Sequence, residues 1–162
     1  MPDKKTREAA AKDRREGKSA STQAGEYVHE EIAHVREGKH GARSTAQAIA
    51  IGLSKARRAG VKVPLKKTAS KSTRQHAAAD EAASHQRAKP SAKRSRASSR
   101  ALKKEGHVAA SKSALSTQAK KSAARRSAGA RSAAAKKAAQ TKGAKGRSAA
   151  AKKAARTRQA AS

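Results

Sequence analysis

The fold of this chain is decided by residues 21–64, which read STQAGEYVHEEIAHVREGKHGARSTAQAIAIGLSKARRAGVKVP. In the first half of this stretch, apolar residues recur at intervals of four, four and three, which places them on one face of a helix. Together with the glycines, this pattern predicts a helix over about 22–37, a short turn, and a second helix over about 45–59. We expect the core of this helix-turn-helix hairpin module to contain Val28, Ile32, Val35, Ile49 and Leu53.

The ends of the two predicted helices carry local signals. Gly38 ends the first helix. Ser44 and Gln47 predict a capping box, in which each side chain accepts a hydrogen bond from a backbone N–H at the start of the second helix. Gly60 suits the left-handed conformation that ends a helix, and Val61 suits the apolar contact that follows it.

Charge is sorted between the two helices. Residues 22–37 carry a net charge of −3 and residues 45–59 carry +3. These opposite charges favour packing within one molecule or between two molecules; alternatively, both faces are simply solvated. A unit of about 40 residues usually needs a disulfide, a metal or oligomerisation, and the chain has no cysteine. We therefore expect a marginally stable monomer or a homo-oligomer formed through residues 21–64.

The remaining sequence predicts helices without a shared core. Residues 1–20 form a charged arm whose predicted helix, over 4–16, has no apolar stripe, so we expect it to be solvated. Residues 65–106 form a basic linker with isolated helices, in which Pro90 breaks a run at about 73–88. The predicted fold class is therefore mainly α, with a short helical hairpin, an N-terminal helical arm and a long basic tail.

Residues 107–162 form an Ala/Lys/Arg-rich tail with 15 basic and no acidic residues. The sequence from Arg131 to Ala139 recurs unchanged from Arg147 to Ala155. Alanine favours helix, but repulsion between the positive charges opposes it. We expect a tail that is largely disordered or forms isolated helices, and that gains helix when a polyanion neutralises it.

The net charge of +30 indicates a polyanionic partner. Nucleic acid is the first expectation, with DNA favoured over RNA. Aromatic residues for base stacking are scarce, because Tyr27 is the only one, and asparagine is absent. We therefore expect contacts to phosphates with little sequence preference, made by the following residues: Lys120, Lys121, Arg125, Arg126, Arg131, Lys136, Lys137, Arg147, Lys152, Lys153, Arg156 and Arg158.

Other functions have weaker support in the sequence. His29 and His34 resemble a metalloprotease helix, but they are five residues apart where H-E-x-x-H requires four. We interpret them as solvated histidines that pair with neighbouring glutamates. We expect no catalytic site, no metal, no cofactor and no small-molecule substrate. No apolar run is long enough to span a membrane, and we expect a cytoplasmic protein located at the nucleoid.

The stretches STQAGEYV (21–28), REGKHGARS (36–44) and QAIAIGLSKARRAG (47–60) are similar to a family of small, basic bacterial proteins whose domain has no assigned function. Residues 91–128 also resemble that family. The tail units AAAKKAA resemble bacterial linker-histone-like proteins. The resemblance implies a bacterial cytosolic protein and supplies no catalytic residues.

We therefore expect non-sequence-specific DNA binding by a nucleoid-associated or linker-histone-like protein. The alternatives are an RNA- or ribosome-associated basic protein, and an adaptor that binds another protein through residues 21–64.

Overall fold

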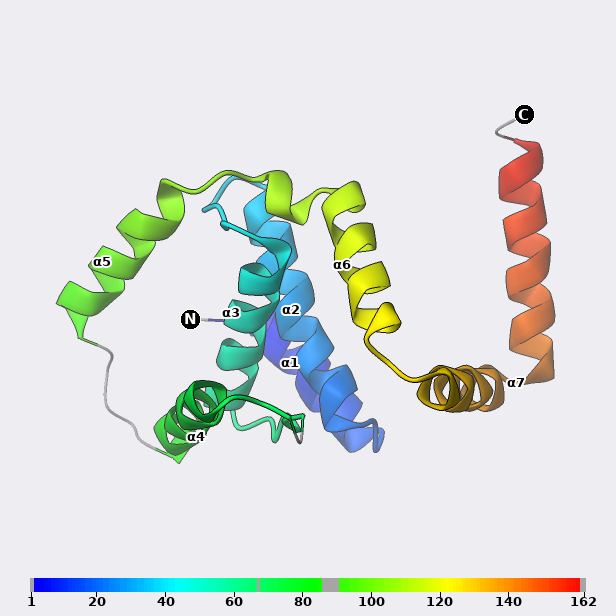
Figure 1. Cartoon of the computed structure of the whole chain (residues 1–162), viewed down its shortest axis with the longest axis horizontal. Coiled ribbons are helices and arrows are strands. Elements are labelled where there is room, and N and C mark those ends of the chain that lie inside the picture. Colours follow the sequence, from blue (N-terminus) through cyan, green and yellow to red (C-terminus); the bar gives the residue numbers. More distant parts are fainter. Residues whose placement is uncertain (1, 67, 86–90, 161–162) are drawn as a thin grey trace. The chain divides into compact units, whose positions relative to one another are not determined.

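The computed structural model describes residues 2–66, 68–85 and 91–160, and it is mainly α (Figure 1). The elements are α1 (Lys4–Arg15), α2 (Ala20–Arg36), α3 (Thr45–Arg58), α4 (Lys71–His85), α5 (Ala92–Lys103), the 3₁₀ turn η1 (Val108–Ala110), α6 (Lys112–Ala124) and α7 (Ala128–Gln159). These described residues include no β-strand. The chain divides into two compact units, residues 1–118 and 119–162.

The predicted hairpin is formed by α2 and α3, and its local signals are confirmed with one correction. Gly38 and Gly60 have positive φ angles of 73° and 85°, and Val61 is buried beyond the end of α3. The Ser44 side chain accepts a hydrogen bond from the backbone N–H of Gln47 at 3.2 Å. The Gln47 side chain accepts from the backbone N–H of Arg43, and not from that of Ser44, so only half of the capping box forms as predicted.

Small residues make the contact of α3 with α2. The buried residues of α3 are Thr45, Ala48, Gly52 and Ala56, at spacings of three, four and four. A Cβ atom added at Gly52 would lie 2.7 Å from the Cα of Val28. The two backbones therefore approach too closely for a larger side chain.

Two apolar clusters hold the first unit together. One contains Ala10, Ala24, Tyr27, Ala56 and Val61, and the other contains Ile32, Val35, Ala42, Ala48 and Ala110. The structure buries two of the predicted core residues, Ile32 and Val35, while Leu53 and Val28 are partly buried and pack against the first and the second cluster respectively. Ile49 is partly buried and is not among the residues packed in either cluster.

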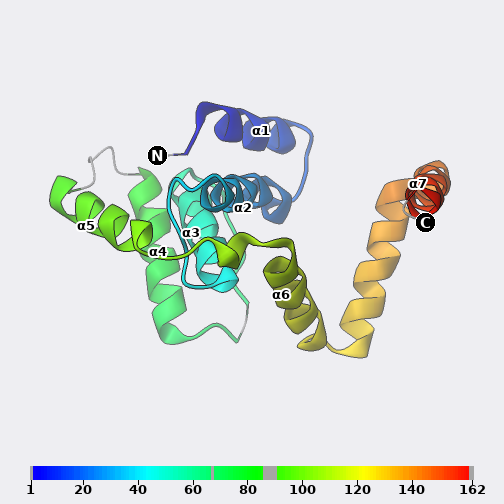
Figure 2. The ribbon, with the colours of Figure 1, turned by 90° about the horizontal axis from the view of Figure 1, so that it is seen from above.

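The prediction of a solvated N-terminal arm is wrong. Figure 2 shows α2 between α1 and α3, and α1 packs along α2. Ala10 and Asp13 of α1 are both buried. The α1–α2 turn is fixed by Gly17, whose φ is 68°, and by an ion pair of 2.7 Å between Lys18 Nζ and Asp13 Oδ1. An alanine is small enough to be buried at a helix contact, so a packed helix needs no stripe of large apolar residues.

Helix α4 is also packed, so the prediction of isolated helices in 65–106 is wrong for this helix, whereas α5 has no buried residue. Helix α4 contacts α3, and its Ala77 and Asp80 are buried. The Arg58 side chain of α3 donates a hydrogen bond to Asp80 at 2.7 Å. Pro90 and the end of the run predicted at 73–88 lie outside the described residues.

The segment from Leu102 to Leu115 docks on the hairpin, so the predicted boundary at residue 107 falls inside a packed region. Ala110 of η1 is fully buried. Arg36 of α2 donates a hydrogen bond to the Ala110 carbonyl at 2.8 Å, and Thr45 donates to the Ala109 carbonyl at 2.6 Å. The segment is therefore held by backbone carbonyls, by alanines and by Leu115, which packs against the second apolar cluster.

In the second unit, α7 contains the two identical repeats. Gly143, with φ 63° and ψ 172°, interrupts the helix between them. The Arg147 guanidinium donates a hydrogen bond to the Ala139 carbonyl at 2.7 Å, across this interruption. No residue of α7 is buried. The predicted disorder of the tail is not confirmed.

Candidate functional site

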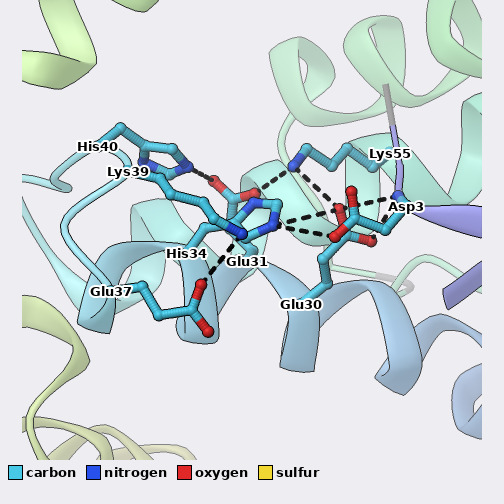
Figure 3. A network of polar contacts seen from close by, with 8 residues as sticks. All are labelled: Asp3, Glu30, Glu31, His34, Glu37, Lys39, His40 and Lys55. Atoms are coloured by element: carbon cyan, nitrogen blue, oxygen red, sulfur yellow. Dashed lines mark hydrogen bonds and ion pairs between the residues drawn. The ribbon is translucent and has the colours of Figure 1, made fainter. Parts of the chain in front are cut away.

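A network of charged side chains connects α2, the α2–α3 loop and α3 (Figure 3). At its centre, the Glu31 side chain is completely shielded from solvent. Lys55 of α3 lies 2.6 Å from Glu31 Oε2 and 3.8 Å from Glu30 Oε1. The opposite charges of the two predicted helices therefore meet within one molecule, through a single lysine of α3.

Two histidines complete the network. His34 Nε2 lies 3.4 Å from Asp3 Oδ2 and 3.9 Å from Glu30 Oε1. His40, in the loop after α2, has its Nδ1 atom 3.1 Å from the Gly41 carbonyl oxygen and its Nε2 atom 3.3 Å from Glu31 Oε1. The two rings are perpendicular, with centroids 6.1 Å apart.

The interpretation of both histidines as solvated is correct for His29, which is exposed, and wrong for His34, which is partly buried. His34 does lie beside a neighbouring glutamate, Glu30, as predicted. His40 was missed because its place beside His34 depends on the turn at Gly38, which reverses the chain. The signal that could have found it is a histidine on each side of a helix-ending glycine.

These side chains provide two sets of potential metal ligands. One ligand atom from each of Glu31, His34 and His40 lies within 4.8 Å of the others, and the same holds for Asp3, Glu30 and His34. The sequence predicted no metal, because the histidines it compared do not share a helix face. The fold brings a different pair together.

The predicted nucleic-acid-binding residues all lie in the second unit, and every one of them is exposed. Residues 119–162 contain 14 lysines and arginines and no acidic residue. Within this unit, Arg131 donates a hydrogen bond to the Arg126 carbonyl and Arg147 to that of Ala139. Most of the positive charge in this unit is therefore presented to solvent.

Arginines also line a groove of about 370 Å³ in the first unit. Arg7 and Arg14 of α1 and Arg58 of α3 contribute to its wall, together with Tyr27. Burial raises the pKa of the Tyr27 hydroxyl, while the nearby Arg7 opposes the shift. Because Tyr27 is 3 % exposed, its ring is not available as a surface for base stacking.

The part of the chain that carries most of the polar network also matches the sequence model of a known protein family. Residues 5–67 match the model of a family of unknown function (DUF6496). The match includes α1, α2 and α3 and confirms the predicted resemblance to an uncharacterised domain over those residues. It does not include residues 91–128 or the C-terminal repeats, so nothing supports the resemblance of the tail to linker-histone-like proteins. No curated protein and no solved structure matches this chain.

None of the helices in the described parts of the chain is long and apolar enough to cross a membrane.

Proposed function

We propose that this protein binds nucleic acid, DNA in preference to RNA, through phosphate contacts with little sequence preference. The observation that carries the proposal is a unit of 44 residues, 119–162, in which 14 lysines and arginines are accompanied by no aspartate or glutamate. Lysine and arginine side chains that replace condensed counterions gain affinity for any phosphate backbone. In this proposal the protein acts at the nucleoid in the cytoplasm, in the manner of a linker-histone-like protein.

The burial of Tyr27 supports contacts to phosphates over contacts to bases. Sequence-tolerant binding of single strands commonly uses exposed aromatic rings as stacking surfaces. The chain has one aromatic residue of the Phe, Trp and Tyr class, and it lies inside the first unit. Charge is therefore the property that this chain offers to a nucleic acid.

Salt dependence of binding to duplex DNA tests the proposal. If half of the 14 cations engage phosphates, the slope of log K against log salt is about −6. Truncation after Gln118 is expected to flatten the slope by that amount, since it removes the second unit and keeps the docked segment. The first unit retains a net charge of +16, so weaker, residual binding is expected. An unchanged slope would contradict a binding surface in the tail.

A matched pair of variants separates the position of the charges from their number. One variant replaces four lysines of the tail repeats with glutamine: Lys136, Lys137, Lys152 and Lys153. Its control replaces four exposed lysines of the first unit: Lys4, Lys5, Lys62 and Lys66. We expect only the tail variant to flatten the slope, by up to about 3.6. Competition between duplex DNA and duplex RNA measures the preference for DNA. If the protein instead binds a protein partner with an affinity that persists at high salt, the alternative function of an adaptor would be indicated.

A further inference from the structure

We propose that Glu31, His34 and His40 form a binding site for a divalent transition-metal ion, with zinc the best match. The site does not depend on nucleic-acid binding. It lies inside the network shown in Figure 3, where two acceptor atoms face each other.

His40 Nε2 and Glu31 Oε1 face each other as two acceptors. The Gly41 carbonyl oxygen, 3.1 Å from His40 Nδ1, can only accept, so Nδ1 carries the proton. In the neutral ring, Nε2 is then unprotonated, and it lies 3.3 Å from Glu31 Oε1. Oε1 of this fully buried carboxylate has no hydrogen-bond donor, while Oε2 lies 2.6 Å from Lys55 Nζ. A cation between Nε2 and Oε1, either a proton or a metal ion, would satisfy both atoms.

The distance between these two atoms suits a tetrahedral metal. With bonds of about 2.0–2.1 Å, tetrahedral zinc holds its ligand atoms roughly 3.3 Å apart. The separation of His40 Nε2 and Glu31 Oε1 is 3.3 Å. The third ligand atom, from His34, lies within 4.8 Å of the others. Closing this set around zinc therefore needs side-chain movement of up to about 1.5 Å.

Both histidines have the outer partners that metal-bound imidazoles use. Such histidines direct their second nitrogen to a carboxylate or a backbone carbonyl, which fixes the tautomer. His40 directs Nδ1 to the Gly41 carbonyl, and His34 directs Nε2 to the carboxylate of Asp3. This leaves His40 Nε2 and His34 Nδ1 to bind the ion.

The loop that carries His40 is held in place by the docked segment. The Gly41 N–H donates to the Leu102 carbonyl at 2.9 Å, and the Ala42 N–H donates to the Gly106 carbonyl at 3.0 Å. A Cβ atom at position 41 would collide with the Glu105 carbonyl, so the approach of the two segments requires glycine there. A metal site on this loop would be preorganised by contacts more than 60 residues away in the chain.

The local charge also favours a divalent ion. Asp3, Glu30 and Glu31 contribute three negative charges to the network and Lys55 one positive charge. With neutral histidines the sum is −2, which one divalent cation neutralises. Two imidazole nitrogens and one carboxylate oxygen match zinc better than calcium or magnesium, which prefer oxygen ligands throughout.

Metal titration of the untagged full-length chain, freed of metal with a chelator, tests the proposal. We expect one equivalent of Zn²⁺ to bind, with a rise in the unfolding midpoint because the ion binds the folded state. Co²⁺ is expected to give the absorption bands of a tetrahedral nitrogen–oxygen site. His40→Asn removes a ligand and is expected to weaken binding at least 10-fold. His29→Asn, on the exposed face of α2, is the matched control and is expected to change nothing.

Nitrogen NMR of the wild-type histidines keeps the test valid if the His40 variant does not fold. On addition of Zn²⁺, we expect the resonances of His40 Nε2 and His34 Nδ1 to shift to the values of metal-bound nitrogen. Saturable binding that depends on His40 and not on His29 would support the site. Equal binding by the two variants, no saturable binding at millimolar Zn²⁺, or a His40 ring that stays doubly protonated with Zn²⁺ present would overturn it.

Discussion

Replacement of Gly52 by alanine tests the packing of α2 against α3. Alanine is favoured over glycine inside a helix by about 1 kcal/mol. However, the new methyl group would lie 2.7 Å from the Val28 Cα, 3.0 Å from the Tyr27 carbonyl oxygen and 3.0 Å from Val28 Cγ2. Overpacking of this kind typically costs about 1–3 kcal/mol, and backbone atoms cannot rotate away. The difference is a net loss, and we therefore expect Gly52→Ala to lower the free energy of unfolding by up to about 2 kcal/mol.

Gly25→Ala in α2 is the matched control, because an added Cβ meets no atom within 4 Å there. This variant is expected to be more stable than the wild type by about 0.5–1 kcal/mol. Urea denaturation followed by tyrosine fluorescence measures both effects. Tyr27 is the only tyrosine and the chain has no tryptophan, so the signal comes from one residue. The Tyr27 side chain lies in the apolar cluster shared by α1, α2 and α3. If Gly52→Ala were as stable as Gly25→Ala, the close approach of the two helices would be refuted.

Three further predictions follow from features already described. Lys55→Met leaves the buried Glu31 carboxylate without its lysine partner and is expected to lower the free energy of unfolding by about 3–5 kcal/mol. The double variant Glu31→Leu/Lys55→Met should recover most of this loss in urea denaturation. A loss below about 1 kcal/mol for Lys55→Met would contradict the burial of the pair. Burial raises the pKa of the Tyr27 hydroxyl, so this hydroxyl holds its proton more tightly in the folded state than in the unfolded state. The contribution to stability is full below the ordinary tyrosine pKa of about 10 and falls as pH rises above it. Ultraviolet titration should show tyrosinate forming at higher pH in the native protein than in urea, and coincident curves would contradict this. Duplex DNA is expected to increase the helical circular dichroism signal of the full chain but not that of a chain truncated after Gln118. The reason is that phosphates reduce the charge repulsion that opposes helix in the tail. An equal increase in both chains would show that the added helix forms in the first unit.

Local signals predicted the hairpin well because they depend on neighbouring residues. Glycine at positions 38 and 60 ends a helix through its own backbone conformation, and Ser44 caps one through a hydrogen bond three residues away. These effects need no knowledge of the rest of the chain. The spacing of large apolar residues likewise identified Ile32 and Val35 as buried.

The packing of α1, α4 and the η1 segment was not predicted because it uses alanine and polar atoms. Ala10, Ala77 and Ala110 are buried, but alanine is common throughout this sequence and its burial has no distinct pattern. A homo-oligomer was expected because a unit of about 40 residues is too small to be stable alone. Helices α1 and α4 and the η1 segment enlarge the packed unit beyond residues 21–64, and the homo-oligomer remains a prediction.

The polar network was beyond local reasoning for a topological reason. Asp3, His40 and Lys55 come from three separate segments, and only the folded arrangement brings them to Glu30, Glu31 and His34 of α2. The complementary charges of α2 and α3 are visible in the sequence. Which of the glutamates is shielded from water depends on the packing of α3 and the α2–α3 loop.

The lack of buried residues in the described part of the second unit has a consequence for how this protein can vary. Each 16-residue period, such as residues 131–146, adds five lysines and arginines and no acidic residue. Since no residue described in 119–160 is buried, duplication or loss of a period would change the positive charge without disturbing the core of the first unit. The length of the tail could therefore be adjusted by selection in steps of five charges, separately from selection on the stability of the helical domain.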